Sequence, residues 1–439
     1  MTPSRHAAEW LHALGPLPAP VAADARLRLL DTLAVAAAAA PLPIGQAVRR
    51  GAAALGQGTQ AGLIGGGRST PALAALVNGA LAHALDFDDT HAASVMHPSA
   101  PAIATALAMA EATGATGDRL LTGIAAGIEL NCRLGLVAPG AFHGVGQHPT
   151  GALGTLSAAM IAAWFLGLTP DGIVAAAGIA ASQSSGVLEA YADGTWSKTL
   201  HPGWAAHAGI AAAHLAAAGF TGPETALDGR YGVFRAHLPA ATPLDFAALT
   251  DGLGTRWHML DTAFKLYPNA HAIHAFIECA LALAVEPTQI VHIEAEIPSW
   301  FAGQIAEPRA AKIAPRTTTH ARASLFYALA CACIDGAVAM AHYQDDAIRR
   351  PDLLAFAARI HHRVTDVPGP IRFCGALTLH TTDGRTLRHA IDHANGTGPR
   401  GLGRAAVERK ARLVAPGPEI ERIIAALDHI DDPAAIIPQ

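Results

Sequence analysis

The chain has little charge for its length and few aromatic rings. Only 15% of its 439 residues are Asp, Glu, Lys or Arg, and 5% are aromatic, although 51% are hydrophobic. It has no basic run and its formal net charge is -5, which excludes the electrostatic footprint of a nucleic-acid-binding protein. Because the apolar residues are mainly small and aliphatic, we expect closely packed helices. The shortage of polar surface favours an oligomer that buries part of it.

Cysteine is also scarce, and its spacing fits neither a zinc cluster nor a disulfide framework. The five cysteines are Cys132, Cys279, Cys331, Cys333 and Cys374, without a C-x-x-C pair. The N-terminal stretch lacks the apolar region of a signal peptide. Residues 150–170 carry no charge and could nominally span a bilayer, but their Ala, Gly and Thr content favours a buried helix. We therefore expect a cytoplasmic protein without membrane contact.

The hydrophobic pattern predicts a mainly α fold, with a large all-helical domain and a smaller α+β lid domain. Apolar residues repeat at helical spacing through most of 20–255. Thr169 and Pro170 have the order of an N-cap followed by the first helical residue. Residues 289–298 alternate in the strand period, and 375–392 form two alternating runs around Asp383-Gly384, which is typical of a β-hairpin.

The change of pattern near residue 286 sets the predicted domain boundaries. We expect strands only after residue 280. The helical domain takes residues 1–258 and returns at 396–439, and the lid takes residues 259–395. The sequence shows no repeat at the period of a solenoid protein and no low-complexity linker between the predicted domains.

Ionisable residues gather in a few short stretches of this apolar chain. The richest is DFDDTHAASVMHPS at 86–99, preceded by His83. Lysines are scarce, so Lys198 and Lys265 indicate a function, since a buried cation is costly unless an anion satisfies it. The stretch at 86–99 has two interpretations: a metal site, or acid–base groups for a small charged substrate.

A metal site needs ligands at a workable spacing, and the sequence offers none. Asp86 and Asp88 would point to different faces of a helix, and no H-E-x-x-H motif is present. Asp89 stands beside Thr90, and the structural interpretation of its side chain is that it caps a helix. We therefore expect no metal and no other cofactor.

The acid–base interpretation rests on two similar helix starts. His97 precedes Pro98-Ser99, and His148 precedes Pro149-Thr150, each before an apolar helical stretch. Helix N-termini attract carboxylates through their free N–H groups and dipole. Together with the two lysines and Tyr267, these histidines would line a pocket for a di- or tricarboxylate. A lone histidine is more often a satisfied core residue, and we interpret the remaining ones so.

Longer motifs resemble the MmgE/PrpD family. They are DFDDT followed by HPS, then HPTGALGTLSAA, SQSSG, KTLHPGWAA and GFTGP, in order from about residue 20 onward. The resemblance implies a large helical domain built from both chain ends, a smaller α+β lid and a homodimer. It also implies cofactor-independent reactions beside carboxylates, such as those of 2-methylcitrate dehydratase, cis-aconitate decarboxylase and iminodisuccinate epimerase.

The resemblance also assigns roles to individual residues. His97 and Tyr327 would be the acid–base pair, with Lys198 beside them, and Asp86, Thr90, His148 and Lys265 would bind substrate. Two departures matter. Arg322-Ala323-Ser324 stands where the family usually has Lys-Phe-Ser, and Ser99 is followed by Ala-Pro where the methylcitrate branch has Asp-Asn.

The sequence therefore predicts a lyase that removes a proton α to a carboxylate, with a dehydratase ranked first. An epimerase of an iminodisuccinate-like diacid and a cis-aconitate-type decarboxylase are the alternatives, because the three reactions share the same catalytic parts. A non-enzymatic helical binding protein is least favoured, since it leaves the isolated lysines and paired His-Pro helix starts without an explanation.

Overall fold

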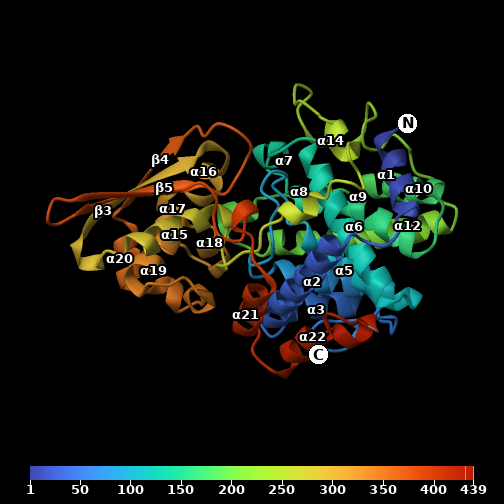
Figure 1. Ribbon diagram of the computed structural model, residues 1–439, viewed down its shortest axis with the longest axis horizontal. Coiled ribbons are helices and arrows are strands. Elements are labelled where there is room, and N and C mark those ends of the chain that lie inside the picture. Colours follow the sequence, from blue (N-terminus) through green and yellow to red (C-terminus); the bar gives the residue numbers. More distant parts are fainter. Residues whose placement is uncertain (431, 439) are drawn as a thin grey trace.

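A computed structural model describes residues 1–430 and 432–438. Helices form most of it and gather in one larger part, whereas a four-stranded sheet lies at the opposite end (Figure 1). Both chain ends lie in the helical part. Its main helices are α1 Pro3–His12, α2 Ala19–Ala39, α3 Pro43–Leu55, α4 Pro71–His83, α5 Ser99–Thr113, α6 Gly117–Leu136, α9 Gly154–Phe165, α10 Pro170–Ala181 and α12 Ser197–Ala217. Shorter ones are α7 Ala141–Gly144, α8 Pro149–Ala152, α11 Ala190–Asp193, α13 Val233–His237 and α14 Ala247–Thr250.

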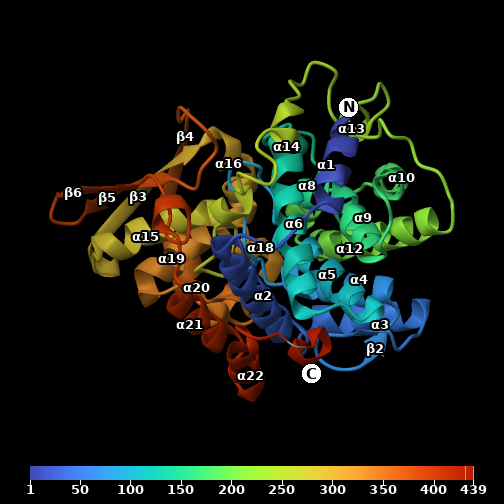
Figure 2. The same cartoon turned by 45° about the vertical axis from the view of Figure 1, so that its right-hand side comes forward.

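Small residues allow the helices of the larger part to pack closely. A Cβ added to Gly79 on α4 would lie 2.7 Å from the Cα of Gly203 on α12, so these two backbones touch. The C-terminal helices α21 Arg404–Val414 and α22 Pro418–Ala426 pack against α2 (Figure 2). The apolar core of this part therefore joins the first and last helices of the chain.

The sheet has the strand order β4-β3-β5-β6. Strand β3 (Ile290–Pro298) pairs in parallel with β4 (Ile360–Thr365) and antiparallel with β5 (Gly375–Thr381), which pairs antiparallel with β6 (Thr386–Ile391). Buried side chains of this sheet form a second apolar core with the helices α15 His274–Leu283, α16 Ser299–Ile305, α19 Leu325–Asp335 and α20 Pro351–Ala357. The short helices α17 Arg309–Ile313 and α18 Thr318–Arg322 precede α19. Strand β3 and the hairpin at Asp383-Gly384 confirm the strand predictions, and Gly384 has the left-handed φ of 84° that the turn requires.

The prediction of a mainly α fold with an all-helical larger domain is wrong. Strands β1 (Ala61–Gly62) and β2 (Arg68–Ser69) pair antiparallel inside the stretch predicted to be helical. Three consecutive glycines at 65–67, all with positive φ, reverse the chain between these strands. The four-stranded sheet is also mixed, because β4 joins in parallel. The fold is mixed α/β with a majority of helix.

None of the described helices is both long and apolar enough to cross a bilayer alone; α2 and α3 meet that criterion only as a pair, and they are bent by 92° where they meet.

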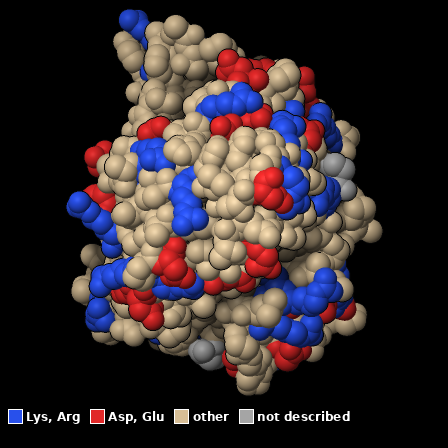
Figure 3. Space-filling view, turned by 90° about the vertical axis from the view of Figure 1, so that its left-hand side faces the viewer, with Lys and Arg blue, Asp and Glu red and all other residues tan. Residues whose placement is uncertain are grey.

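On the face shown in Figure 3, basic and acidic side chains are interspersed. Arg363 and Arg388, for example, both pair with Glu296.

Candidate functional site

The site centres on the loop between α4 and α5, which contains the DFDD stretch. This loop is not helical, and Asp86 has a left-handed φ of 49°. Three consecutive carbonyls of the loop accept hydrogen bonds from buried cations of distant segments. Arg322 donates to Leu85, Lys265 to Asp86 and Lys410 to Phe87, at 2.8, 2.8 and 2.9 Å. The loop conformation therefore depends on side chains from three later parts of the chain.

Asp88 joins two histidines at the centre of the site. Its Oδ2 lies 2.8 Å from Nδ1 of His83 and 3.2 Å from Nδ1 of His97. On the opposite side of His83, Nε2 lies 2.8 Å from Nζ of Lys198, which has protons to donate. His83 is therefore a neutral ring that donates to Asp88 and accepts from Lys198. Asp88 likewise favours the proton of His97 on Nδ1, which leaves Nε2 with a free lone pair.

Asp86 holds the two lysines that the sequence singled out. Its Oδ1 lies 2.6 Å from Nζ of Lys265 and 4.0 Å from Nζ of Lys198. Burial opposes the charge of Asp86, but these two ammonium groups outweigh it and hold its pKa below the ordinary range. The structure thus brings together Asp86, His97, Lys198 and Lys265 of the predicted site.

Burial keeps the histidines of the site neutral. It lowers the pKa of His97 to about 4, although Asp88 acts in the opposite direction. It also lowers the pKa values of His83 and His148. Burial opposes the charge of Asp88 too, but the two imidazoles at its carboxylate keep its pKa below the usual value. At neutral pH the site therefore combines carboxylates and ammonium groups with uncharged imidazoles.

Few of these side chains keep any exposed surface. The side chain of His97 is 12% exposed, that of Asp86 15% and that of Lys198 7%, whereas His83 and Asp88 have none. A ligand can therefore contact His97, Asp86 and Lys198 directly. Asp88 and His83 act on it only through these neighbours.

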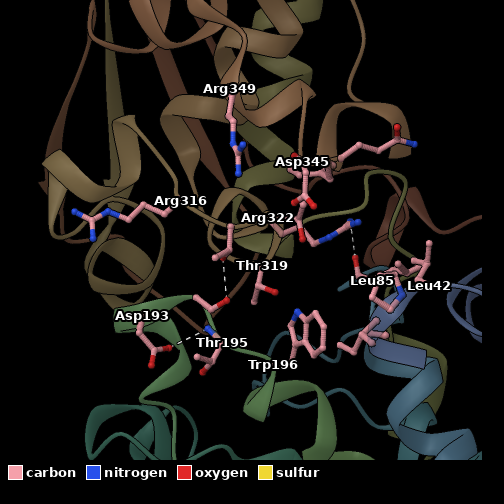
Figure 4. Close-up of a pocket in the computed structure, with 18 residues that line it drawn as sticks. Leu42, Leu85, Asp193, Thr195, Trp196, Arg316, Thr319, Arg322, Asp345 and Arg349 are labelled. Carbon is pink, nitrogen blue, oxygen red and sulfur yellow. Dashed lines mark hydrogen bonds between the residues drawn. The ribbon is translucent and has the colours of Figure 1, made fainter. Parts of the chain in front are cut away.

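Several cavities adjoin the site, and two of them share Arg322. An enclosed one of about 20 Å³ is lined by His83, Asp86, Tyr191 and Lys198, among others. Its volume is about that of one water molecule. A larger pocket of about 740 Å³ opens beside it, between segments 193–196 and 316–322 (Figure 4). Ala84, Thr319 and Arg322 line both cavities, so they form the wall between them.

The remaining predicted residues lie at different distances from this centre. The His148 ring centroid is 5.5 Å from that of His83, and its Nδ1 is 3.0 Å from Nδ1 of His201. Thr90 pairs through its backbone with Ala263, and its hydroxyl is buried with no hydrogen-bond partner among the described residues.

Tyr327 contacts other groups. Its hydroxyl donates to the backbone carbonyls of His342 and Ala347, at 2.6 and 3.1 Å. Its ring belongs to the apolar core beneath the sheet. No hydrogen bond in the described structure joins it to His97 or Lys198, and its role as a proton donor stays a prediction.

Sequence reasoning missed several groups of the site. His83 and Asp88, which contact Lys198 and His97, are not among the predicted site residues, and neither is Tyr191. Arg322 enters the predictions only as a departure from a family motif. The proximity of His83 to the DFDD stretch was the one signal that could have included it, because a histidine and an aspartate five residues apart can meet across a turn.

Two groups of side chains in this site are close enough for a metal ion by distance. The ligand atoms of His83, His97 and His148 lie within 4.8 Å of one another, as do those of Asp86, Asp88 and His97. Both ring nitrogens of His83 already have partners, and one partner is an ammonium group that repels a cation. Asp86 of the second group likewise has two ammonium groups beside its carboxylate. These two donor sets therefore fit a divalent cation poorly.

Comparison with known proteins agrees with this geometry. The MmgE/PrpD N-terminal domain matches residues 5–245, and the MmgE/PrpD C-terminal domain matches residues 267–429. A cis-aconitate decarboxylase of Aspergillus terreus is 24% identical over 95% of this chain and 91% of its own length. The human cis-aconitate decarboxylase is 28% identical over 83% of this chain and 78% of its own length. The two domain matches cover nearly the whole chain, which therefore belongs to the MmgE/PrpD family.

Proposed function

We propose that the protein is a cofactor-independent hydro-lyase that acts on a small di- or tricarboxylic acid. The observation that supports this best is the neutral, partly exposed imidazole of His97, whose Nδ1 lies 3.2 Å from the Asp88 carboxylate and whose ring contacts His83, the partner of Lys198. A base must be unprotonated and accessible to its substrate: the lowered pKa of His97 meets the first condition, and its 12% exposed side chain supports the second.

The proposed reaction removes a proton from a carbon next to a carboxylate. Nε2 of His97 takes the proton, the C–H electron pair forms a carbon–carbon double bond, and the neighbouring C–O bond breaks. The proton on His97 then passes to the departing hydroxide, which leaves as water, and the imidazole is neutral again. Lys198 binds the adjacent carboxylate and stabilises the negative charge that develops on it. Asp86 keeps Lys198 and Lys265 in place, and its low pKa keeps it ionised throughout.

Decarboxylation is the second candidate, because the named relatives are cis-aconitate decarboxylases. That reaction needs a group that delivers a proton to carbon after carbon dioxide leaves. The lowered pKa of His97 makes its ring a poor proton donor at neutral pH, and for this reason we rank proton removal first.

Incubation in deuterium oxide, followed by proton NMR, tests the proposal. Candidate acids are 2-methylcitrate, cis-aconitate and iminodisuccinate, each with and without EDTA. We expect loss of water with new olefinic signals, unaffected by EDTA. Release of carbon dioxide would show a decarboxylase instead. Deuterium that enters the α-carbon without loss of either group would show an epimerase.

The pH dependence of the wild type and of a His97 variant tests the assigned base. We expect kcat/KM to fall below a pH of about 4, because a protonated His97 can no longer accept a proton. His97→Asn should lower kcat by about 10²–10⁴-fold, the usual contribution of a general base. His214→Asn, an exposed position on α12, is the matched control and should leave kcat unchanged. An unchanged rate in His97→Asn would refute this role.

We also propose that the enzyme works as a homodimer in the cytoplasm. The composition supports an oligomer, and the family resemblance supports a dimer. Sedimentation equilibrium would settle the first point: a monomer at micromolar concentration contradicts it.

A further inference from the structure

Arg322 is a buried cation without an acidic partner. Its side chain is at the end of α18, and only 7% of the residue is exposed. Its Nη1 donates to the carbonyls of Leu85 and Pro268, at 2.8 and 2.6 Å. Its guanidinium carbon lies 4.7 Å from the centroid of the Tyr343 ring. No carboxylate of the described residues forms an ion pair with it.

Such an arrangement compensates the guanidinium charge only in part, through the more distant carboxylate of Asp86. Burial lowers the pKa of Arg322 to about 10, so the surroundings oppose its charge. Both carbonyls accept from Nη1 of the guanidinium group, and the described structure shows no hydrogen bond from Nη2 or Nε. A guanidinium fork is suited to bind a carboxylate in a bidentate manner.

The position of Arg322 indicates which carboxylate it would meet. It forms part of the wall between the enclosed cavity, where Lys198 lies, and the larger pocket. In Figure 4 the Arg322 side chain runs through the upper part of that pocket toward Leu85, above Trp196. The enclosed cavity is too small for a whole diacid. A substrate with one carboxylate at Lys198 that extends into the larger pocket therefore passes Arg322.

We propose that Arg322 binds a second carboxylate of the substrate and so restricts the site to acids with at least two carboxylates. The inference rests on the proposed function, because it places the reacting end of the substrate at His97 and Lys198. Arg322 is then a specificity-determining residue that is absent from the predicted set.

A matched pair of ligands tests this directly by calorimetric binding, without turnover. The probes are propane-1,2,3-tricarboxylate and its analogue with one terminal carboxylate replaced by a primary amide. We expect the wild type to prefer the acid by at least about tenfold, the usual effect of a charge-assisted pair. In Arg322→Gln the preference should fall to near one. Arg316→Gln, an exposed arginine of the same pocket, should retain the wild-type preference.

The result that overturns the inference is an acid preference that survives in Arg322→Gln, even if both affinities fall, since that pattern reports a structural role only. Should the glutamine variant not fold, Arg322→Lys decides: it keeps the charge without the fork, and an unchanged preference again refutes the inference. A wild type that binds neither probe refutes both proposals. An unchanged rate in His97→Asn refutes the proposed function alone, because the binding preference is measured independently of chemistry.

Discussion

Lys312 on α17 is fully buried, and nothing among the described residues accepts a hydrogen bond from its Nζ. Its Nζ lies 5.9 Å from the centroid of the Tyr191 ring, the same distance as Nζ of Lys198. Burial lowers the pKa of Lys312 from 10.5 to about 8. At neutral pH this ammonium group therefore destabilises the folded state.

Lys312→Met should stabilise the protein in a pH-dependent way. The folded pKa lies below the unfolded one, so the destabilisation is complete below pH 8 and disappears as the pH rises toward 10.5. We expect the variant to gain at most about 3 kcal/mol of unfolding free energy at pH 7 and almost nothing at pH 10.5. Urea denaturation at both pH values measures this. An equal gain at both would show that packing, and not charge, is responsible.

Single residues show how far the sequence could predict the site. The charged lysines and His97 could be identified because they are rare polar groups in apolar surroundings. Asp88 could not, since its contact with His97 depends on the left-handed turn at Asp86, which no residue pattern encodes. The hydroxyl of Tyr327 donates to the backbone carbonyl of His342. This contact depends on how segments outside its own helix pack, which the local sequence does not encode.

At the scale of elements, the contact between α4 and α12 positions the reactive groups. His83 ends α4 and Lys198 is near the start of α12, and their nitrogens are 2.8 Å apart. Gly79 and Gly203 allow the approach, because a Cβ on either residue would overlap the backbone of the opposite helix.

Gly203→Ala should separate these helices and weaken activity. Overpacking of this kind costs about 1–3 kcal/mol of unfolding free energy. It should also lower kcat, because Lys198 would move away from His83. Gly51→Ala on α3 is the control: its Cβ would meet nothing within 4 Å, and it should be neutral or slightly stabilising. Thermal denaturation and kcat are the measurements. Equal behaviour of the two variants would contradict the role of this contact.

The same scale shows which elements the sequence could predict. Strand β3, the hairpin at Gly384 and the Thr169 N-cap all follow from local patterns, and the Thr169 hydroxyl indeed accepts from the N–H of Gly172. Strands β1 and β2 have two residues each, too short for any period to appear. The parallel pairing of β4 depends on the path of the intervening helices, which no local pattern encodes.

At the scale of the whole molecule, a buried ion pair connects the two ends of the chain. Nζ of Lys410 on α21 lies 2.7 Å from Oδ1 of Asp31 on α2, and it also donates to the carbonyl of Phe87. The predicted domain boundaries near residues 258 and 395 stay predictions.

Removing one partner of this pair should be far more damaging than removing both. Lys410→Met leaves Asp31 buried without its cation, which typically costs about 3–5 kcal/mol. The double variant Asp31→Asn with Lys410→Met should recover much of this loss. Arg412 on the same helix forms an exposed ion pair with Glu421. Arg412→Ala should therefore cost less than about 1 kcal/mol of unfolding free energy. Chemical denaturation of the wild type, Lys410→Met, the double variant and Arg412→Ala measures these differences in unfolding free energy. A double variant as unstable as the single one would contradict the expectation.

The three carbonyls held by Arg322, Lys265 and Lys410 also have a consequence for biosynthesis. Residues 85–87 leave the ribosome early, but the cation that binds Phe87 is on a helix made near the end of translation. The loop can adopt its final shape only after that helix has been synthesised and has docked. We therefore expect a chain that ends before this helix to lack the loop conformation on which the proposed site depends.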